Sequence, residues 1–178
     1  LKRRGYKSTL EYLRDMAQLV LEHTHLLPHL NPGTMGRGEI GFLKNSSASM
    51  GIMLENVSER LCGPSGPHRL APSKWPRARL KTMEKAGELK VPFTTGILVG
   101  IGETRTEVID SLLAIRNLQA RFGHIQEVIV QNFRAKPETA MSERPDATRE
   151  YLLWCLATAR LILGPGANIQ APPNLSGD

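Results

Sequence analysis

The segment from Val91 to Thr104 constrains the fold more than any other part of the chain. Its sequence, VPFTTGILVGIGET, starts as an apolar, β-branched run, passes through Gly100 and Gly102, and ends where a helical pattern begins. This order predicts a buried strand, a glycine loop and a helix. Glycines there would let backbone N–H and C=O groups lie against a flat ligand. The alternative is that they only make the turn, as in many strand–helix loops.

Helix and strand patterns alternate along the whole chain. Helical periodicity, twice opened by an S/T-x-x-E capping box, predicts helices over residues 8–24, 76–89, 104–121 and 148–163. Apolar runs predict strands over residues 26–30, 47–54, 91–99, 127–132 and 168–171. Residues 35–44 have only weak helical character, because glycines interrupt them. Such alternation is typical of right-handed βαβ units around a parallel sheet.

The number and order of these elements predict the architecture. We expect a single α/β domain over residues 1–178 whose first element is a helix without a strand to pack on. Five strands are too few for a closed parallel barrel. The prediction is a partial (β/α) TIM-type barrel whose opening βα units are missing, and the initial Leu in place of Met agrees with a missing upstream segment.

Polar residues gather at or just after the carboxyl ends of the predicted strands. They are His29, Asn31, Glu55, Asn56, Glu103, Gln131, Asn132, Arg134, Gln170 and Asn174. Parallel α/β barrels assemble their active sites on this face. The opposite loops carry mostly helix ends, so the asymmetry favours a site at the strand ends.

A stretch rich in glycine and proline precedes the helix predicted to begin at Pro76. It contains Gly63-Pro64, Gly66-Pro67-His68 and Pro72. An irregular segment of this length inside a compact α/β unit is usually functional or mobile. For His68, a contact with substrate and a turn without function agree equally well with the pattern.

Composition excludes several classes of protein. No apolar run is long enough to span a membrane, and the charged N-terminus lacks the apolar run of a signal peptide. The two cysteines, Cys62 and Cys155, match neither a disulfide framework nor a metal-binding spacing. Reduced thiols in a cytoplasmic protein fit this usage best.

The net charge of +6 raises nucleic-acid binding as an alternative. The basic residues are scattered, and the tightest groups are Lys2, Arg3, Arg4 and then Lys74, Arg77, Arg79, Lys81. Solvated helix faces, or an anionic small molecule, explain them better than DNA or RNA. We expect no nucleic-acid partner and no membrane partner.

Seven motifs form a specific set that covers most of the chain. They are LLPHLNPG at 26–33, SASMGIMLEN at 47–56, SERL at 58–61, GPH at 66–68, the segment 91–104, HIQEVIVQNFRAKP at 124–137 and IQAPPN at 169–174. Together they resemble the FO synthase family, and more narrowly its 7,8-didemethyl-8-hydroxy-5-deazariboflavin synthase subunit or half.

The resemblance implies a radical S-adenosylmethionine (SAM) enzyme with a partial TIM barrel. In this family a [4Fe-4S] cluster reduces SAM and gives a 5′-deoxyadenosyl radical. The implied reaction is an oxidative ring closure with ammonia loss, on a small-molecule adduct of tyrosine's hydroxybenzyl group with a ribitylaminouracil, in deazaflavin coenzyme biosynthesis. The cofactor performs the difficult chemistry, while the protein orients it and excludes water. A companion tyrosine-using synthase subunit or fused half is the implied partner.

The resemblance also assigns cofactor-binding roles. Gly96-x-Leu98-x-Gly100-x-x-Glu103 is similar to the superfamily's GxIxGxxE pattern, with Leu in place of Ile, whose apolar residue and backbone flank the adenine. Glu55 would accept hydrogen bonds from the SAM ribose. Arg79 would meet the SAM carboxylate, which a guanidinium can bind through two parallel hydrogen bonds.

We expect five of the remaining strand-end residues to contact the substrate. His29, Asn31, Gln131, Asn132 and Arg134 would face its uracil edge and ribityl hydroxyls, which need donors and acceptors. The cofactor residues have alternatives: Glu55 as a surface carboxylate at a strand end, and Arg79 as a solvated helix arginine paired with Glu84.

One family feature is absent from the sequence. The CxxxCxxC motif that holds the cluster does not occur, and two distant cysteines cannot replace its three thiolates. We therefore expect this polypeptide to be inactive alone. The alternatives are a non-catalytic truncated remnant, a sister radical SAM enzyme of the same subgroup, and a basic nucleic-acid-binding module.

Overall fold

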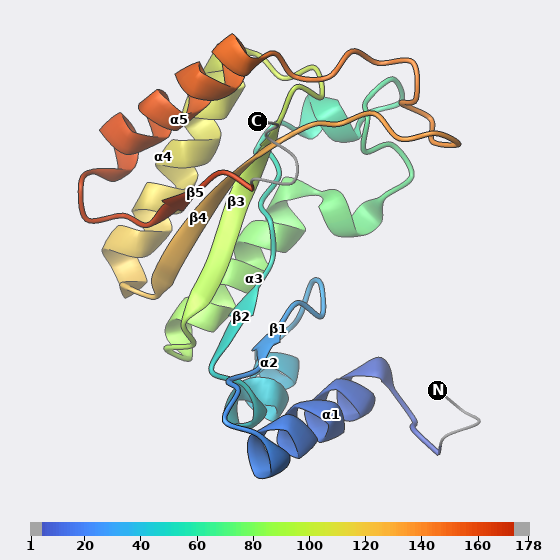
Figure 1. Cartoon of the computed structure of the whole chain (residues 1–178), viewed down its shortest axis with the longest axis vertical. Helices are drawn as coiled ribbons and strands as arrows, with labels where there is room; N and C mark the ends of the chain where they lie inside the picture. The colour runs from blue at the N-terminus through green and yellow to red at the C-terminus, as the bar shows by residue number, and fades with distance from the viewer. Residues whose placement is uncertain (1–4, 173–178) are drawn as a thin grey trace.

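A computed structural model describes residues 5–172 and places five parallel strands in one sheet. The strands follow one another across the sheet in their order along the chain (Figure 1). They are β1 (His29–Leu30), β2 (Ser49–Gly51), β3 (Phe93–Val99), β4 (Ile125–Asn132) and β5 (Ile169–Gln170). The predicted strand-end residue Asn174 and the basic group Lys2, Arg3, Arg4 lie outside the described residues.

In the described part of the chain, one helix precedes the first strand, the other four connect successive strands, and the helices pack on one another. They are α1 (Thr9–His23), α2 (Arg37–Leu43), α3 (Pro76–Glu88), α4 (Arg105–Phe122) and α5 (Arg149–Leu163). Each contacts the next, and Figure 1 shows α4 and α5 side by side along β4 and β5. Three short 3-10 turns lie in the connections: η2 (Lys44–Ser46), η3 (Glu59–Cys62) and η4 (Pro72–Lys74). Sequential parallel strands backed by a row of helices form part of a (β/α) barrel.

Local capping explains where the main helices begin. The Ser8 Oγ accepts from the Glu11 N–H at 3.1 Å ahead of α1. Thr104 and Glu107 exchange the two hydrogen bonds of a capping box ahead of α4, which ends at Gly123 with φ +64°. Over residues 5–172, none of the helices has the length and apolarity needed to cross a membrane.

The helix α2 forms where the sequence predicted only weak helical character. Gly36 is the N-cap residue rather than an interior one, and its N–H donates to the Glu39 carboxylate at 2.7 Å. Ile40 and Leu43 are fully buried in the core. Burial of these two side chains offsets the helix propensity lost at the glycines.

The two faces of the sheet differ in a way that positions the site. On β3, Phe93, Ile97 and Val99 alternate along one face and are at most 1% exposed, because the helices cover them. Residues of the other face, such as Ile129 and Gln131 on β4, are only partly buried. This inner face corresponds to the interior of a barrel, and it lines the cavities described below.

Candidate functional site

Glu55 lies where the chain after β2 leaves the edge of β3. Its N–H donates to the Gly96 carbonyl at 3.1 Å, and its carbonyl accepts from the Leu98 N–H at 3.0 Å. Glu55 has φ +66°, a left-handed conformation that costs a non-glycine residue about 1 kcal/mol or more. The two bonds to β3 hold this conformation. Glu55 is only 8% exposed, so the alternative that it is a surface carboxylate is wrong.

The Glu55 carboxylate is paired with two cations through one of its oxygens. Oε1 accepts from Lys74 Nζ at 3.0 Å and from Arg79 Nη1 at 3.2 Å. Pairing of this kind is what a buried charge requires. Oε2 makes no hydrogen bond within the described residues, so it can accept one from a ligand.

Arg79, on α3, is buried and held by the protein on two of its three nitrogens. Its Nε donates to the Ser73 carbonyl at 2.9 Å, and its Nη1 donates to the Met53 carbonyl as well as to Glu55. Burial lowers the pKa of Arg79, and the neighbouring Glu55 carboxylate opposes this change. Nη2 alone remains for a ligand among the described contacts, so the expected two-point grip on a carboxylate would become a single contact.

The alternative for Arg79, a solvated arginine paired with Glu84, is wrong. Glu84 pairs instead with Arg121, at 3.1 Å. The basic group that raised nucleic-acid binding is also divided, because Lys74 and Arg79 face Glu55 while Arg77 lies over the Trp75 ring. Sequence reasoning missed the contact between Lys74 and Glu55, and no local signal links two residues 19 positions apart.

A cavity of about 680 Å³, the barrel cavity, opens on the inner face of the sheet; its lining includes His29, Asn31, Glu55, Arg79 and Gln131. The His29 Nδ1 lies 2.7 Å from the Ser49 Oγ, and its Nε2 lies 3.3 Å from the Asn31 Oδ1. Gly51 leaves room for this pair, because a Cβ there would lie 2.5 Å from the Asn31 Oδ1.

A second cavity of about 400 Å³, the rim cavity, lies at the strand ends; its lining includes His68, Lys74, Leu98, Ile101, Gln131, Asn132 and Arg134. The residues predicted to face the substrate are therefore divided between two cavities. His29 and Asn31 line the barrel cavity, Asn132 and Arg134 line the rim cavity, and Gln131 lines both. Arg134 also pairs with Asp146 at 2.9 Å.

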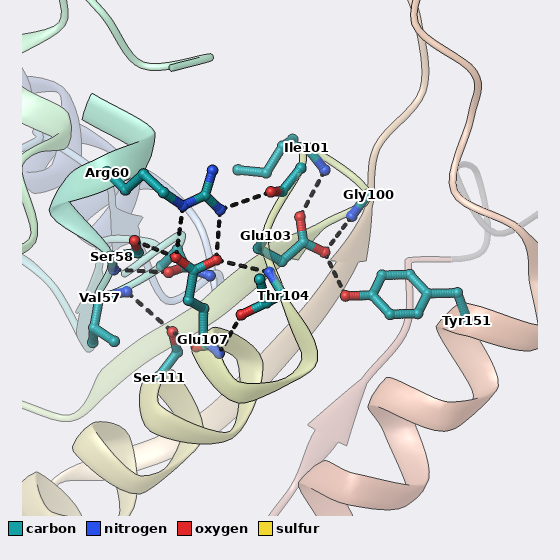
Figure 2. Close-up of polar contacts among 12 residues, drawn as sticks. Val57, Ser58, Arg60, Gly100, Ile101, Glu103, Thr104, Glu107, Ser111 and Tyr151 are labelled. Atoms are coloured by element: carbon teal, nitrogen blue, oxygen red, sulfur yellow. Dashed lines mark hydrogen bonds and ion pairs between the residues drawn. The ribbon is translucent and has the colours of Figure 1, made fainter. Parts of the chain in front are cut away.

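The glycine loop, residues 100–103, uses its backbone polar groups within the protein. The N–H groups of Gly100 and Ile101 donate to the Glu103 carboxylate at 2.7 and 2.8 Å (Figure 2). The Gly100 carbonyl accepts from Arg144 Nε at 2.9 Å, and the Gly102 carbonyl accepts from Arg60 Nη2 at 2.8 Å. These four backbone groups are therefore bonded within the protein, and the expected contact of the loop with a flat ligand stays a prediction. The Leu98 and Ile101 side chains line the rim cavity instead.

The glycines of this segment serve close packing. A Cβ at Gly96 would lie 2.1 Å from the Ile129 carbonyl oxygen, so only glycine allows β3 and β4 to approach as they do. Gly100 has φ +92°, and a Cβ there would lie 2.6 Å from the Ala147 Cβ. Neither Gly96 nor Gly100 is among the residues that line the two cavities.

Tyr151, on α5, stabilises the Glu103 carboxylate, which in turn binds the backbone of the glycine loop. Its hydroxyl donates to the Glu103 Oε1 at 2.8 Å (Figure 2). Burial and the adjacent carboxylate raise the pKa of Tyr151, so the hydroxyl stays protonated and remains a donor. Sequence reasoning missed Tyr151, whose helical spacing reads as ordinary core.

Arg60 and Glu107 tie η3 to the start of α4 behind the loop. Arg60 donates from Nε and Nη2 to Glu107 at 3.0 and 2.8 Å, and the Ser58 hydroxyl also donates to this carboxylate (Figure 2). These contacts, with Arg60 the strongest, lower the pKa of Glu107 to about 2 despite its partial burial. Glu107 therefore stays charged and keeps the loop anchored.

The cysteines are buried apart from the two cavities. Cys155 lies in the core with no exposed surface, and burial raises its pKa to about 12. Burial also raises the pKa of Cys62, whose Sγ donates to the Lys74 carbonyl at 3.6 Å. In the part of the chain between residues 5 and 172, no three His, Cys, Asp or Glu side chains gather as metal ligands.

Comparison with curated proteins identifies close relatives. FO synthase from Mycobacterium tuberculosis is 58% identical over 180 residues, which cover 100% of this chain and 21% of that protein. The 7,8-didemethyl-8-hydroxy-5-deazariboflavin synthase of Methanopyrus kandleri is 52% identical over 176 residues, covering 99% of this chain and 52% of that protein. The chain thus spans between a fifth and about half of the relatives it matches. No protein-family model matches.

Solved structures share the fold at low sequence identity. The FeFe-hydrogenase maturase HydG from Carboxydothermus hydrogenoformans superposes with a TM-score of 0.74 at 18% identity, over 93% of this chain and 39% of that one. Methylornithine synthase (PylB) superposes with a TM-score of 0.66 at 18% identity, over 92% of this chain and 52% of that one. The expected fold class, a partial TIM-type barrel, is confirmed. Along its whole length the chain is therefore homologous to a segment of the FO synthases, and the resemblance drawn from its motifs is confirmed.

Proposed function

We propose that this chain forms the SAM- and substrate-binding part of a radical SAM synthase that makes 7,8-didemethyl-8-hydroxy-5-deazariboflavin. The identity to FO synthases supports the reaction class. The observation that carries the site is the position of Glu55, which lines the barrel cavity while its partner Lys74 lines the rim cavity. A ligand in the barrel cavity would meet this carboxylate directly, and a ligand in the rim cavity would meet its partner Lys74.

The rim cavity suits an adenosyl group. Leu98 and Ile101 supply an apolar wall for a flat base, and the polar groups around them suit ribose hydroxyls. Glu55 and Arg79 line the barrel cavity, so the ribose and the carboxylate of the ligand would extend from the rim cavity toward them. There the Glu55 Oε2 would accept a hydrogen bond from a ribose hydroxyl, and the Arg79 Nη2 would meet the ligand carboxylate. When bound, SAM and a [4Fe-4S] cluster supply the radical chemistry, and these residues orient the adenosyl group.

The barrel cavity suits the polar substrate. His29 and Asn31 present a hydrogen-bonding pair at one wall, and Gln131 can contact ligands in both cavities. An aminouracil with a ribityl chain offers donors and acceptors for such groups. The hydroxybenzyl ring would lie toward the rim cavity, next to the proposed adenosyl site.

The described residues do not fit a [4Fe-4S] cluster. The two cysteines are buried and belong to different elements, whereas three thiolates are needed. In this proposal the cluster ligands come from sequence beyond the 178 residues, and the 178 residues alone do not catalyse the reaction. A companion tyrosine-using subunit or fused half stays a prediction.

Calorimetric titration of the purified chain with SAM tests the proposal. We expect Glu55→Gln to weaken SAM binding about tenfold, because a charged acceptor for a ribose hydroxyl is lost. Glu59→Gln is the matched control, since Glu59 is exposed on η3 and should leave binding unchanged. Circular dichroism shows whether Glu55→Gln stays folded, and Glu55→Asp, which keeps the charge, replaces it if not. No heat from the wild-type chain, or equal affinities for all variants, would contradict the assignment.

A further inference from the structure

His68 belongs to the glycine- and proline-rich segment between η3 and η4, and it lines the rim cavity. It is 7% exposed, although the segment around it is largely at the surface. A histidine in a turn without function is expected to point its ring into solvent. Here the segment buries the ring beside a cavity.

Hydrogen bonds fix the backbone around His68. The His68 N–H donates to the Leu61 carbonyl at 2.9 Å, and its carbonyl accepts from the Ala71 N–H at 3.1 Å. Gly66 permits this winding, because a Cβ there would lie 2.1 Å from the Leu61 carbonyl oxygen. The segment therefore holds the imidazole at a defined place at the edge of the cavity.

The ring carries an unsatisfied polar atom. The Nε2 of His68 is buried and has no hydrogen-bond partner within the described residues. Most buried polar groups in proteins are hydrogen-bonded, and an unpaired one is costly. A partner supplied by a bound molecule would remove this cost.

Burial of the His68 ring favours its neutral form. Burial, helped by Lys74 and Arg79 and opposed by Glu55, lowers the pKa of His68. A neutral imidazole offers Nε2 as an acceptor in one tautomer and as a donor in the other. Adenine and ribose present both kinds of group.

His124 is a second buried histidine of the same fold, and its Nδ1 also has no hydrogen-bond partner within the described residues. Its ring lies against Phe93 and Phe122, its Nε2 lies 3.0 Å from the Met83 carbonyl oxygen, and it lines neither cavity. It is also 7% exposed, and burial lowers its pKa as well. The two histidines thus match in burial and differ in their access to the rim cavity.

We propose that His68 hydrogen-bonds through Nε2 to the molecule bound in the rim cavity, which is the adenosyl group if the function proposed above holds. The segment 63–74 would then supply two ligand-facing groups, His68 and Lys74, beside the glycine loop. The sequence motif GPH would mark a binding element rather than a turn.

Titration of the ¹⁵N-labelled chain with SAM, followed by NMR of the histidine rings and backbone amides, tests this proposal. We expect the His68 Nε2 signal to move together with the amides of Leu98 and Ile101, while the His124 ring signals stay in place. In affinity measurements, His68→Leu should weaken SAM binding about tenfold. His68→Gln should restore much of the loss, because its side-chain amide can occupy the position of Nε2.

The outcomes separate this proposal from the proposed function. If the Leu98 and Ile101 amides move while the His68 ring does not, or if His68→Leu binds SAM as tightly as wild type, the role of His68 is overturned and the rim cavity remains the SAM site. If SAM moves none of these signals, both proposals are overturned. If His68→Leu fails to fold, the ring signals of the wild-type chain decide the question alone.

Discussion

The glycine loop and the Glu55 wall, which consists of Glu55 and Arg79, use their polar groups differently. In the loop, the N–H groups of Gly100 and Ile101 and the carbonyls of Gly100 and Gly102 are bonded to other protein groups. Around Glu55, the carboxylate Oε2 and the Arg79 Nη2 make no hydrogen bond within the described residues. The loop is thus a pre-organised scaffold, and the wall has capacity left for a ligand.

This contrast separates structural residues, whose polar groups already have protein partners, from ligand-facing residues, whose polar groups do not. A buried polar group must find a partner in the protein, in water or in a ligand. Substitutions in the loop should therefore change stability first. Substitutions at the wall should change binding first, and the following predictions test this division.

The largest effect is expected for Glu103→Ala. The substitution leaves the Gly100 and Ile101 N–H groups and the Tyr151 hydroxyl without their acceptor, so the free energy of unfolding should fall by about 3 kcal/mol. Urea denaturation measures it. Glu143→Ala, at an exposed position, should change stability by less than about 0.5 kcal/mol. Equal stabilities of the two variants would remove the scaffold role of the loop.

For the ligand-facing residues, we expect His29→Ala to change ligand affinity rather than stability. His29 is exposed at the barrel cavity, so its loss should leave stability nearly unchanged. If the proposed function holds, it should weaken binding of the deazaflavin about five- to tenfold, because one hydrogen-bonding group is lost. Fluorescence titration with the deazaflavin measures the affinity, and His23→Ala, on the exposed end of α1, is the control. A large stability loss with intact binding would reverse the assignment.

A smaller effect on the loop is expected for Tyr151→Phe. This variant removes one hydroxyl that donates to Glu103 and keeps the ring, so stability should fall by about 1 kcal/mol. Tyr12→Phe serves as the control, because its hydroxyl makes no hydrogen bond in the described part of the chain. Thermal denaturation of the pair should separate them. A Tyr151→Phe protein as stable as its control would show that Glu103 does not need this donor.

The smallest effect concerns acid stability behind the loop. The pKa of Glu107 is about 2 in the folded chain, against an ordinary value of 4.5, because Arg60 and Ser58 donate to it. A depressed carboxylate pKa contributes stability that is complete above pH 4.5 and is lost as the pH falls toward 2. Unfolding measured across this window should show a steeper loss in wild type than in Arg60→Gln. Parallel curves would show that Arg60 does not stabilise the charged form.

Much of the fold was predictable because its signals are local. The capping residues Ser8 and Thr104 fixed two helix starts, and the run before Gly100 gave β3 to within two residues. The helix α2 was underestimated, because the burial of Ile40 and Leu43 is a tertiary effect.

The sequence predicted which residues belong to the candidate site better than it predicted the contacts between them. Strand-end position brought Glu55 and His29 to one cavity, as expected. The pairing of Lys74 with Glu55 and the support of Glu103 by Tyr151 join residues 19 and 48 positions apart, and only the folded chain shows them. The roles of the glycines changed for the same reason, because Ile129 and Ala147 approach them from other parts of the chain.

A crystal structure of this chain grown with SAM would show whether the rim cavity and Glu55 bind the adenosyl group. We expect difference density for the adenosyl group in the rim cavity, with a ribose hydroxyl within hydrogen-bond distance of the Glu55 Oε2 and the adenine beside Leu98. Density for SAM at another surface, with the rim cavity empty and Glu55 still bonded only to Lys74 and Arg79, would contradict it.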